Sequence, residues 1–319
     1  RPPRSTPKPS SAASDVYKRQ SMISTFNQQW EKIAQCDGFI AALDQSGGST
    51  PKALEMYGIG SNHYDSDAMM FDAVHAMRSR NITSPSFNGD RILAAILFED
   101  TLKRDINGIN SADYLWQEKN IVPLIKVDKG LLAECDGVQL MKPMPELNAL
   151  LTLAKNKQVF GTKMRSVIKA ANDEGINRLV NQQFTVAKQI IAAGLVPIIE
   201  PEVDIHADDK ADIETLLRAA LLNELNALTD DQTVMLKLTL PSQTNFYHSC
   251  INHSNILRVV ALSGGYNRNE ANQKLMANQG MIASFSRALT EGLRHQLNDS
   301  EFNQQLDNSI EDIFLASKT

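Results

Sequence analysis

One lysine of the sequence lies in the middle of an apolar run that should be buried. In "VMLKLTLPS" (234–242), Leu236 and Leu238 fall on one face of an alternating pattern, and Lys237 falls on the other. A period of two predicts a β-strand, which Pro241 ends. The two leucines are expected to face a layer of helices. Burying an ammonium group without a partner is costly, so Lys237 is expected to have both a partner and a purpose.

Charged residues occupy similar positions in other apolar runs of the sequence. Side chains two residues apart point the same way along a strand, and we expect Asp44 to end the first strand and Arg287 to lie on the eighth. The candidates are Asp44, Lys126, Asp128, Lys163, Arg165, Glu200, Glu202, Lys237 and Arg287. Converging so many charges merely to hold strands together would carry a large desolvation cost. The sequence therefore favours an active site over a structural salt-bridge network.

Cations outnumber carboxylates in this predicted cluster, which suits an anionic ligand. In "ALSGG" (261–265), Gly264 and Gly265 let backbone N–H groups approach an oxyanion closely. The turn follows the seventh predicted strand, next to Arg287, and barrel enzymes often bind phosphate at this position. We expect a phosphate site there.

A second glycine-containing turn lies at the end of the first predicted strand. "DQSGGST" (44–50) offers the hydroxyl groups of Ser46 and Ser49 beside two glycines. Its alternative interpretation is a plain turn between a strand and a helix. Two phosphate sites on opposite sides of one mouth would indicate a bisphosphorylated substrate.

The lysines suggest a particular chemistry. A free lysine has a pKa of about 10.4 and is almost entirely protonated at neutral pH. A neighbouring cation such as Lys163 would favour the neutral amine of Lys237, which could then attack a ketone and form a Schiff base. Glu200 could move protons as water leaves, and Glu202, two positions away, could help to hold the two carboxyl pKa values apart.

Eight apolar runs alternate with helical patterns from residue 38 onward. Strands are expected at 38–45, 91–100, 121–129, 159–168, 194–203, 233–242, 256–265 and 280–289. This alternation predicts an α/β fold, a (β/α)8 TIM barrel, with extra C-terminal helices over 288–316. The alternative is an open doubly wound sheet. Such a sheet usually carries a GxGxxG or Walker loop, and neither occurs here.

Composition narrows the class of protein. The 319 residues are 42% hydrophobic and 22% charged, with a net charge of -5, which gives no general attraction to nucleic acid or to anionic membranes. No apolar run approaches the roughly 20 residues of a membrane-spanning helix. The three cysteines, Cys36, Cys135 and Cys250, are few and widely spaced. They favour free thiols in a reducing cytoplasm over disulfides or a metal site.

The N-terminal segment differs from the rest in composition. Residues 1–21 are rich in Pro, Ser and Arg and lack the apolar core of a signal peptide. We expect this segment to be disordered, and "SDVYKRQ" resembles translated adapter sequence. The native protein is expected to begin at Met22, and residues 22–319 to form a single barrel domain with a C-terminal helical tail.

Several motifs together resemble those of one enzyme family. They are "AALDQSGGS", "IKVDKG", "KMRSVI", "VPIIEPEV", "MLKLTLPS", "ALSGGYNRNEAN" and "ASFSRAL", and they occur in family order between about residues 25 and 290. The sequence resembles the class I fructose-bisphosphate aldolases, particularly their short bacterial branch. The resemblance implies reversible cleavage of fructose 1,6-bisphosphate in glycolysis and gluconeogenesis. It also implies no metal, no other cofactor and a homo-oligomer.

The resemblance also implies roles for individual residues. Lys237 is similar to the Schiff-base lysine, and Glu200 to the acid–base glutamate, with Glu202 as its partner. Lys163 resembles the lysine that assists carbinolamine formation, and Arg165 lines the same region. Asp44 resembles the aspartate that orients the substrate and helps to deprotonate its C4 hydroxyl. The implied C1-phosphate site is Ser263, Gly264, Gly265 and Arg287, and the implied C6-phosphate side is Ser46, Ser49 and Lys126.

Three alternatives stay open at this point. Tagatose or sedoheptulose bisphosphate could be preferred, because hydroxyl stereochemistry cannot be read from sequence. A zinc-dependent aldolase needs several histidines, and His206, His248 and His253 are the one close group. A non-catalytic protein on the same fold would be expected to lose Lys237 or Glu200, and both are present.

Overall fold

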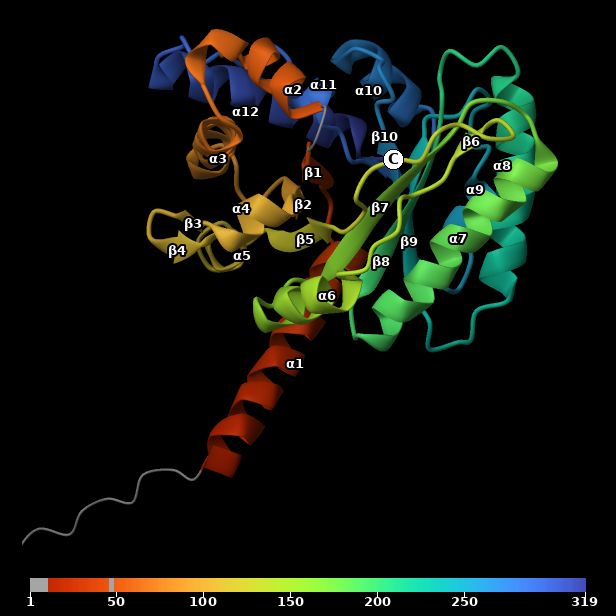
Figure 1. Cartoon of the computed structure of the whole chain (residues 1–319), viewed down its shortest axis with the longest axis horizontal. Coiled ribbons are helices and arrows are strands. Elements are labelled where there is room, and N and C mark those ends of the chain that lie inside the picture. The colour runs from red at the N-terminus through yellow and green to blue at the C-terminus, as the bar shows by residue number, and fades with distance from the viewer. Residues whose placement is uncertain (1–10, 46–48) are drawn as a thin grey trace, which may run out of the picture.

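The computed structural model describes residues 11–45 and 49–319, with side chains from residue 20 onward. Eight parallel strands form a nearly closed barrel (Figure 1). They are β1 (Phe39–Leu43), β2 (Ile92–Leu97), β5 (Val122–Lys126), β7 (Gly161–Ile168), β8 (Val196–Val203), β9 (Val234–Thr239), β10 (Ile256–Leu262) and β11 (Met281–Ala283). Each strand lies inside a predicted range, so the prediction of a (β/α)8 barrel is confirmed.

The barrel strands follow one another in chain order, and each pairs in parallel with the next. The last gap lies between β11 and β1. It is bridged by the Ala42 N–H, which donates to the carbonyl oxygen of Phe285 at 3.2 Å. All eight strands therefore direct their carboxyl ends to the same rim of the barrel.

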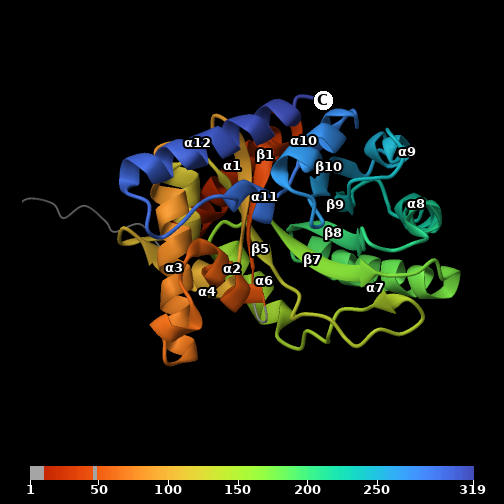
Figure 2. The same ribbon diagram turned by 90° about the horizontal axis from the view of Figure 1, so that it is seen from above.

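Helices cover the outside of the barrel, and Figure 2 shows α12 lying across one side of it. The helices are α1 (Ser11–Gln35), α2 (Ser49–Tyr57), α3 (Asp67–Thr83), α4 (Glu99–Lys103), α5 (Ser111–Asp113), α6 (Leu147–Asn156), α7 (Asp173–Ala192), α8 (Lys210–Asn226), α9 (His248–Ile251), α10 (Arg268–Met276), α11 (Arg287–Thr290) and α12 (Asp299–Ala316). The shorter elements are η1 (Ser61–His63), η2 (Tyr114–Glu118), β3 (Asp105–Ile106), β4 (Ile109–Asn110) and β6 (Val138–Gln139). In the described part of the chain, no helix is long and apolar enough to span a membrane.

Alternation along the strands divides the apolar side chains between two cores. On β9, Leu236 and Leu238 pack in the layer between strands and helices, as expected, whereas Met235 packs inside the barrel. The inner core is built in the same way from other strands, by residues that include Ile40, Ala94, Leu124, Ile198 and Val260. Because side chains on a strand point alternately to its two faces, Lys237 must point inward like Met235.

Helix α7 shows how the outer layer is specified. Its apolar stripe is buried against the strands, through Ile176, Leu179, Val180, Phe184, Ala187 and Ile190. The side chain of Asn172 caps its first turn by accepting a hydrogen bond from the Gly175 N–H at 2.8 Å. The chain leaves the helix at Gly194, whose φ of +82° is readily adopted only by glycine.

The N-terminal helix closes the barrel at the rim opposite the carboxyl ends of the strands. Phe26 and Trp30 of α1 contact Phe160, which directly precedes β7, with ring centroids 5.0 and 6.1 Å apart. Helix α1 begins at Ser11, so part of the segment expected to be disordered is helical. Residues 1–10 lie outside the described part of the chain.

Deletion of residues 1–21 should leave activity and thermal stability nearly unchanged. The side chains of α1 that pack against the barrel, Phe26, Trp30 and Ile33, all follow the deleted segment. The free energy of unfolding should change by no more than about 0.5 kcal/mol, as for surface changes. Urea unfolding of the full-length and shortened chains measures this. A loss above about 1 kcal/mol would show that the segment docks on the barrel.

Candidate active site

A cavity of about 470 Å³ opens at the carboxyl-end rim of the barrel. Its lining includes Asp44, Ser49, Lys126, Asp128, Lys163, Arg165, Glu200, Glu202, Lys237, Ser263, Gly264 and Arg287. The structure thus brings together nearly all of the residues that we predicted to form one site. Gly265 lies next to Arg287, since a Cβ atom built on it would be 3.7 Å from the guanidinium Nη2. Ser46 lies outside the described residues.

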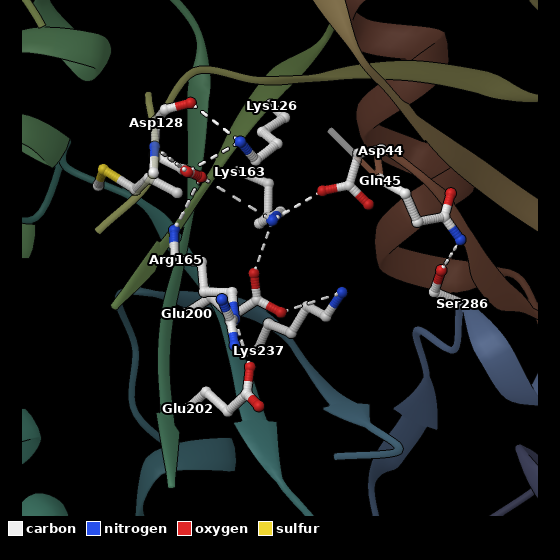
Figure 3. Close-up of polar contacts among 12 residues, drawn as sticks. Asp44, Gln45, Lys126, Asp128, Lys163, Arg165, Glu200, Glu202, Lys237 and Ser286 are labelled. Atoms are coloured by element: carbon white, nitrogen blue, oxygen red, sulfur yellow. Dashed lines mark hydrogen bonds and ion pairs between the residues drawn. The ribbon is translucent and has the colours of Figure 1, made fainter. Parts of the chain in front are cut away.

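Lys237 lies on β9 and points into this cavity with its side chain 5% exposed. Its Nζ is 3.2 Å from Oε1 of Glu200, on the neighbouring strand β8 (Figure 3). The carboxylate of Glu200 is therefore the partner that we expected for a lysine buried in an apolar run. The amine and the carboxylate are close enough for direct proton transfer.

Lys163 on β7 is the centre of the charge cluster. Its Nζ lies 2.7 Å from Oδ2 of Asp44, 2.8 Å from Oε2 of Glu200 and 4.0 Å from Oδ2 of Asp128 (Figure 3). Burial by itself lowers the pKa of Lys163, but the carboxylates, Asp44 first, outweigh it and raise the pKa well above the ordinary value. Lys163 is therefore a fixed cation at neutral pH.

Asp44 follows β1 directly and is correspondingly a fixed anion. Burial by itself raises its pKa, but the charges of Lys163, Lys237 and Lys126 outweigh this effect and bring the pKa down to about 2. The largest of these charge effects comes from Lys163. Asp44 therefore stays ionised at every pH at which the protein is expected to work.

Asp128 organises the neighbouring part of the site, although we gave it no role from sequence. Its carboxylate lies 2.9 Å from Lys126 Nζ and accepts hydrogen bonds from the backbone N–H groups of Arg165 and Gly130, at 3.1 and 3.2 Å. We expected Asp128 on the third strand, but β5 ends at Lys126. The spacing of two between Lys126 and Asp128 had placed Asp128 among the candidates without indicating its role.

Glu202 has a partner of its own. The Nε of Arg165 forms an ion pair with its Oε2 at 2.5 Å. From sequence we expected Glu200 and Glu202 to control each other's pKa, but the structure gives each carboxylate a different cation. Glu200 contacts Lys163 and Lys237, and it is the carboxylate placed for proton transfer.

The first predicted phosphate site combines two neighbouring turns. Gly264 and Gly265 have φ values of +61° and +117°, which favour glycine, and so the backbone can turn sharply after β10. The prediction that Arg287 lies on the eighth strand is wrong, because β11 ends at Ala283 and Arg287 begins α11. The strand ends early where Phe285 bonds to β1. The exposed guanidinium of Arg287 nevertheless lines the cavity.

Three cavity residues that were not found from sequence contact one another through Gln45, which lies shortly after β1. The side-chain amide of Gln45 donates to the hydroxyl of Ser286 across the mouth (Figure 3), and its backbone carbonyl accepts from the guanidinium of Arg78 on α3. Arg78 comes from a helix, where the period-two pattern that identified the other charges gives no signal. Gln45 and Ser286 are common residues in turns and carried no distinctive spacing.

The histidines considered for zinc lie outside this cavity. His206 and His248 are exposed, and His253 lies beside Asn226, with its Nε2 3.1 Å from the amide oxygen. Among the residues that the structure describes, no three His, Cys, Asp or Glu side chains are grouped as a metal site.

Comparison with known proteins identifies the family. A family model described as "Fructose-bisphosphate aldolase class-I" matches residues 27–255. Two relatives named "Fructose-bisphosphate aldolase class 1" are those of Synechocystis sp., 63% identical over 92% of this chain and 97% of its own, and Porphyromonas gingivalis, 55% identical over 91% and 98%. A fructose-bisphosphate aldolase structure from Plasmodium falciparum has the same fold, with a TM-score of 0.75 and 20% identity over 93% of this chain and 95% of its own. The chain belongs to the class I fructose-bisphosphate aldolases.

Proposed function

We propose that Lys237 is the nucleophile that forms the Schiff base with fructose 1,6-bisphosphate, and that the products are dihydroxyacetone phosphate and glyceraldehyde 3-phosphate. One observation carries this assignment. Lys237 Nζ lies 3.2 Å from Glu200, and the other oxygen of the same carboxylate is held by Lys163 at 2.8 Å. A lysine, a proton acceptor and a fixed cation are thus joined in one buried chain of contacts.

Glu200 moves the protons of the first steps. It takes a proton from Lys237, and the neutral amine then adds to the C2 carbonyl of the substrate to give a carbinolamine. Glu200 returns a proton to the departing hydroxyl, so that water leaves and the iminium forms. The cation of Lys163 stabilises negative charge on the C2 oxygen during the attack.

The iminium nitrogen is the electron sink for cleavage. The electron pair of the C3–C4 bond moves toward it to form an enamine. C4 becomes the carbonyl carbon of the aldehyde product as its hydroxyl passes its proton to Glu200, which is ionised again after the loss of water. We assign to Asp44 the orientation of that hydroxyl, as the acceptor of its hydrogen bond. A carboxylate with a pKa of about 2 is a reliable acceptor but a weak base, so orientation is its main contribution.

Two phosphate groups account for the cations around the mouth. We assign the C1 phosphate to Ser263, Gly264, Gly265 and Arg287, and the C6 phosphate to the side of Ser46, Ser49 and Lys126. Preference for tagatose or sedoheptulose bisphosphate has less support, because both relatives named above are fructose-bisphosphate aldolases. Turnover rates on fructose, tagatose and sedoheptulose bisphosphate test this order of preference.

Arg287→Ala should weaken binding of fructose 1,6-bisphosphate by about 1.5–3 kcal/mol, the range for hydrogen bonds to charged groups. The exposed position of this arginine keeps the expected loss moderate. Fructose 6-phosphate, which lacks the C1 phosphate, should be affected much less. Steady-state KM and kcat for both substrates provide the measurement. Equal losses on both would count against the C1-phosphate assignment.

The proposal extends to metal dependence, compartment and assembly. Cleavage through a lysine requires no metal, so turnover in excess EDTA should equal turnover without it. The three cysteines are free thiols, which supports a reducing cytoplasm as the working compartment and glycolysis as the setting. We also propose a homo-oligomer, and light scattering after size-exclusion chromatography tests its size.

A further inference from the structure

Arg78 is a buried arginine beside the active site. Its side chain comes from α3 and lines the cavity, although the residue is only 1% exposed. Nη1 donates to the hydroxyl of Thr101 at 2.9 Å, Nη2 donates to the backbone carbonyl of Gln45, and the guanidinium carbon lies 5.7 Å from the centre of the Phe98 ring. All three neighbours are uncharged. Nε, which is also buried, has no hydrogen-bond partner among the residues that the structure describes.

Arg78 differs in this respect from the lysines that the strands bring to the cavity. Lys126, Lys163 and Lys237 each have a carboxylate oxygen within 3.2 Å. Within the described part of the chain, no carboxylate oxygen lies within 4.0 Å of the Arg78 guanidinium. The carboxylates of Asp44 and Asp100 act on this charge only from beyond ion-pair distance, and burying a cation without a direct counter-ion is costly. A cavity that keeps such a charge is suited to an anionic ligand that supplies the missing partner.

The position of Arg78 indicates which part of the substrate supplies this anion. Gln45, whose carbonyl it binds, lies in the turn between β1 and α2, on the side assigned to the C6 phosphate. Arg287 is on the other side, and no carboxylate oxygen is within 4.0 Å of its guanidinium among the described residues either. The only cation assigned to the C6 side so far, Lys126, already contacts Asp128 at 2.9 Å. Each end of a bisphosphate would thus face one arginine that lacks a direct ion pair among the described residues.

We propose that Arg78 recognises the phosphate on the aldehyde half of the substrate and so sets the preference of this site for bisphosphorylated ketoses. This inference rests on the proposed function. The hydrogen bonds to Thr101 and Gln45 place the guanidinium, and its charge provides the recognition. Burial lowers the pKa of Arg78 to about 10, so it is still a cation at neutral pH.

The test compares two substrates that differ by that phosphate. For Arg78→Met, kcat/KM for fructose 1,6-bisphosphate should fall by about 30-fold or more, the lower bound for removing one partner of a desolvated charge pair. For fructose 1-phosphate it should change by no more than about twofold. Arg78→Lys, which keeps the charge but not the planar fork, should lie between the wild type and Arg78→Met. In the reverse direction, the loss should appear with glyceraldehyde 3-phosphate and not with glyceraldehyde.

Arg80 offers a matched control on the same helix. It contacts Tyr57 and Asp299 and does not line the cavity, so Arg80→Met should not change the ratio of the two kcat/KM values. If Arg78→Met does not fold, Arg78→Lys and Thr101→Val carry the same comparison. Equal losses on both substrates would mean a structural role and overturn the proposal, as would the absence of any loss.

One further measurement separates this inference from the proposed function. Dihydroxyacetone phosphate lacks the aldehyde half, so borohydride should trap it on Arg78→Met at the wild-type rate. A wild-type enzyme that traps nothing on Lys237 would contradict the proposed function itself. Trapping by the wild type together with loss of trapping in Arg78→Met would leave that function intact and overturn the role of Arg78.

Discussion

Borohydride added together with dihydroxyacetone phosphate should inactivate the wild-type enzyme permanently, and Lys237→Arg should form no such adduct. Reduction of the iminium gives a stable secondary amine, and peptide mapping should place the added mass on the segment that contains Lys237. A guanidinium cannot be deprotonated to a useful nucleophile near neutral pH. Turnover of Lys237→Arg should therefore fall on the order of 10⁵–10⁶-fold, as when another covalent nucleophile is removed.

The structure also indicates why the adduct should form on Lys237 and not on Lys163. Lys163 lies between Asp44 and Glu200, at 2.7 and 2.8 Å, and these carboxylates raise its pKa, so it stays protonated. Lys237 forms one ion pair in the described part of the chain, with Glu200 at 3.2 Å. Glu200→Gln should slow trapping without preventing it, since the amine remains while its proton acceptor is lost. A label on Lys163 or Lys126 would show that our choice of nucleophile is wrong.

The fold was largely predictable because burial and periodicity act together on the strands. Leu236, Lys237 and Leu238 alternate, so burial of both leucines requires one arrangement of the strand. The leucines face the helices and the lysine faces the barrel axis. The carboxyl ends of parallel strands meet at one rim, so charges on different strands were expected to converge. Strand positions therefore predicted most of the site without any knowledge of long-range contacts.

Other parts of the site depend on geometry that no local pattern contains. The pairing of Arg165 with Glu202, and not of the two glutamates with each other, depends on the register between β7 and β8. Arg78 reaches the site from the middle of a helix, where a buried arginine looks like any polar residue on an amphipathic face. The helical start at Ser11 runs against a composition that predicted disorder.

Lys163→Met should be the most damaging substitution that leaves the nucleophile in place. It removes the cation between Asp44 and Glu200 and leaves two buried carboxylates close together, one of them still paired with Lys237. Breaking a buried ion pair costs about 3–5 kcal/mol of the free energy of unfolding. Turnover should fall about 10²–10³-fold, the range for loss of one group that stabilises developing negative charge on an oxygen. Urea unfolding and steady-state kinetics at pH 7 measure both effects.

The dependence of this stability loss on pH distinguishes charge from packing. In the wild type the pKa of Asp44 is about 2, below its ordinary value of 3.8, so its contribution to stability is fully present above about pH 4 and is lost as the pH falls toward 2. Without Lys163, burial should raise the pKa of Asp44. In the variant this carboxylate therefore becomes neutral at a higher pH, and its burial then costs less free energy. The difference in unfolding free energy between wild type and variant should therefore be largest at pH 7 and should shrink by pH 3. Adding Asp44→Asn to Lys163→Met should recover part of the loss at pH 7, because it removes one uncompensated charge. An equal difference at both pH values, with no recovery in the double variant, would mean that Lys163 contributes through packing and not through its charge.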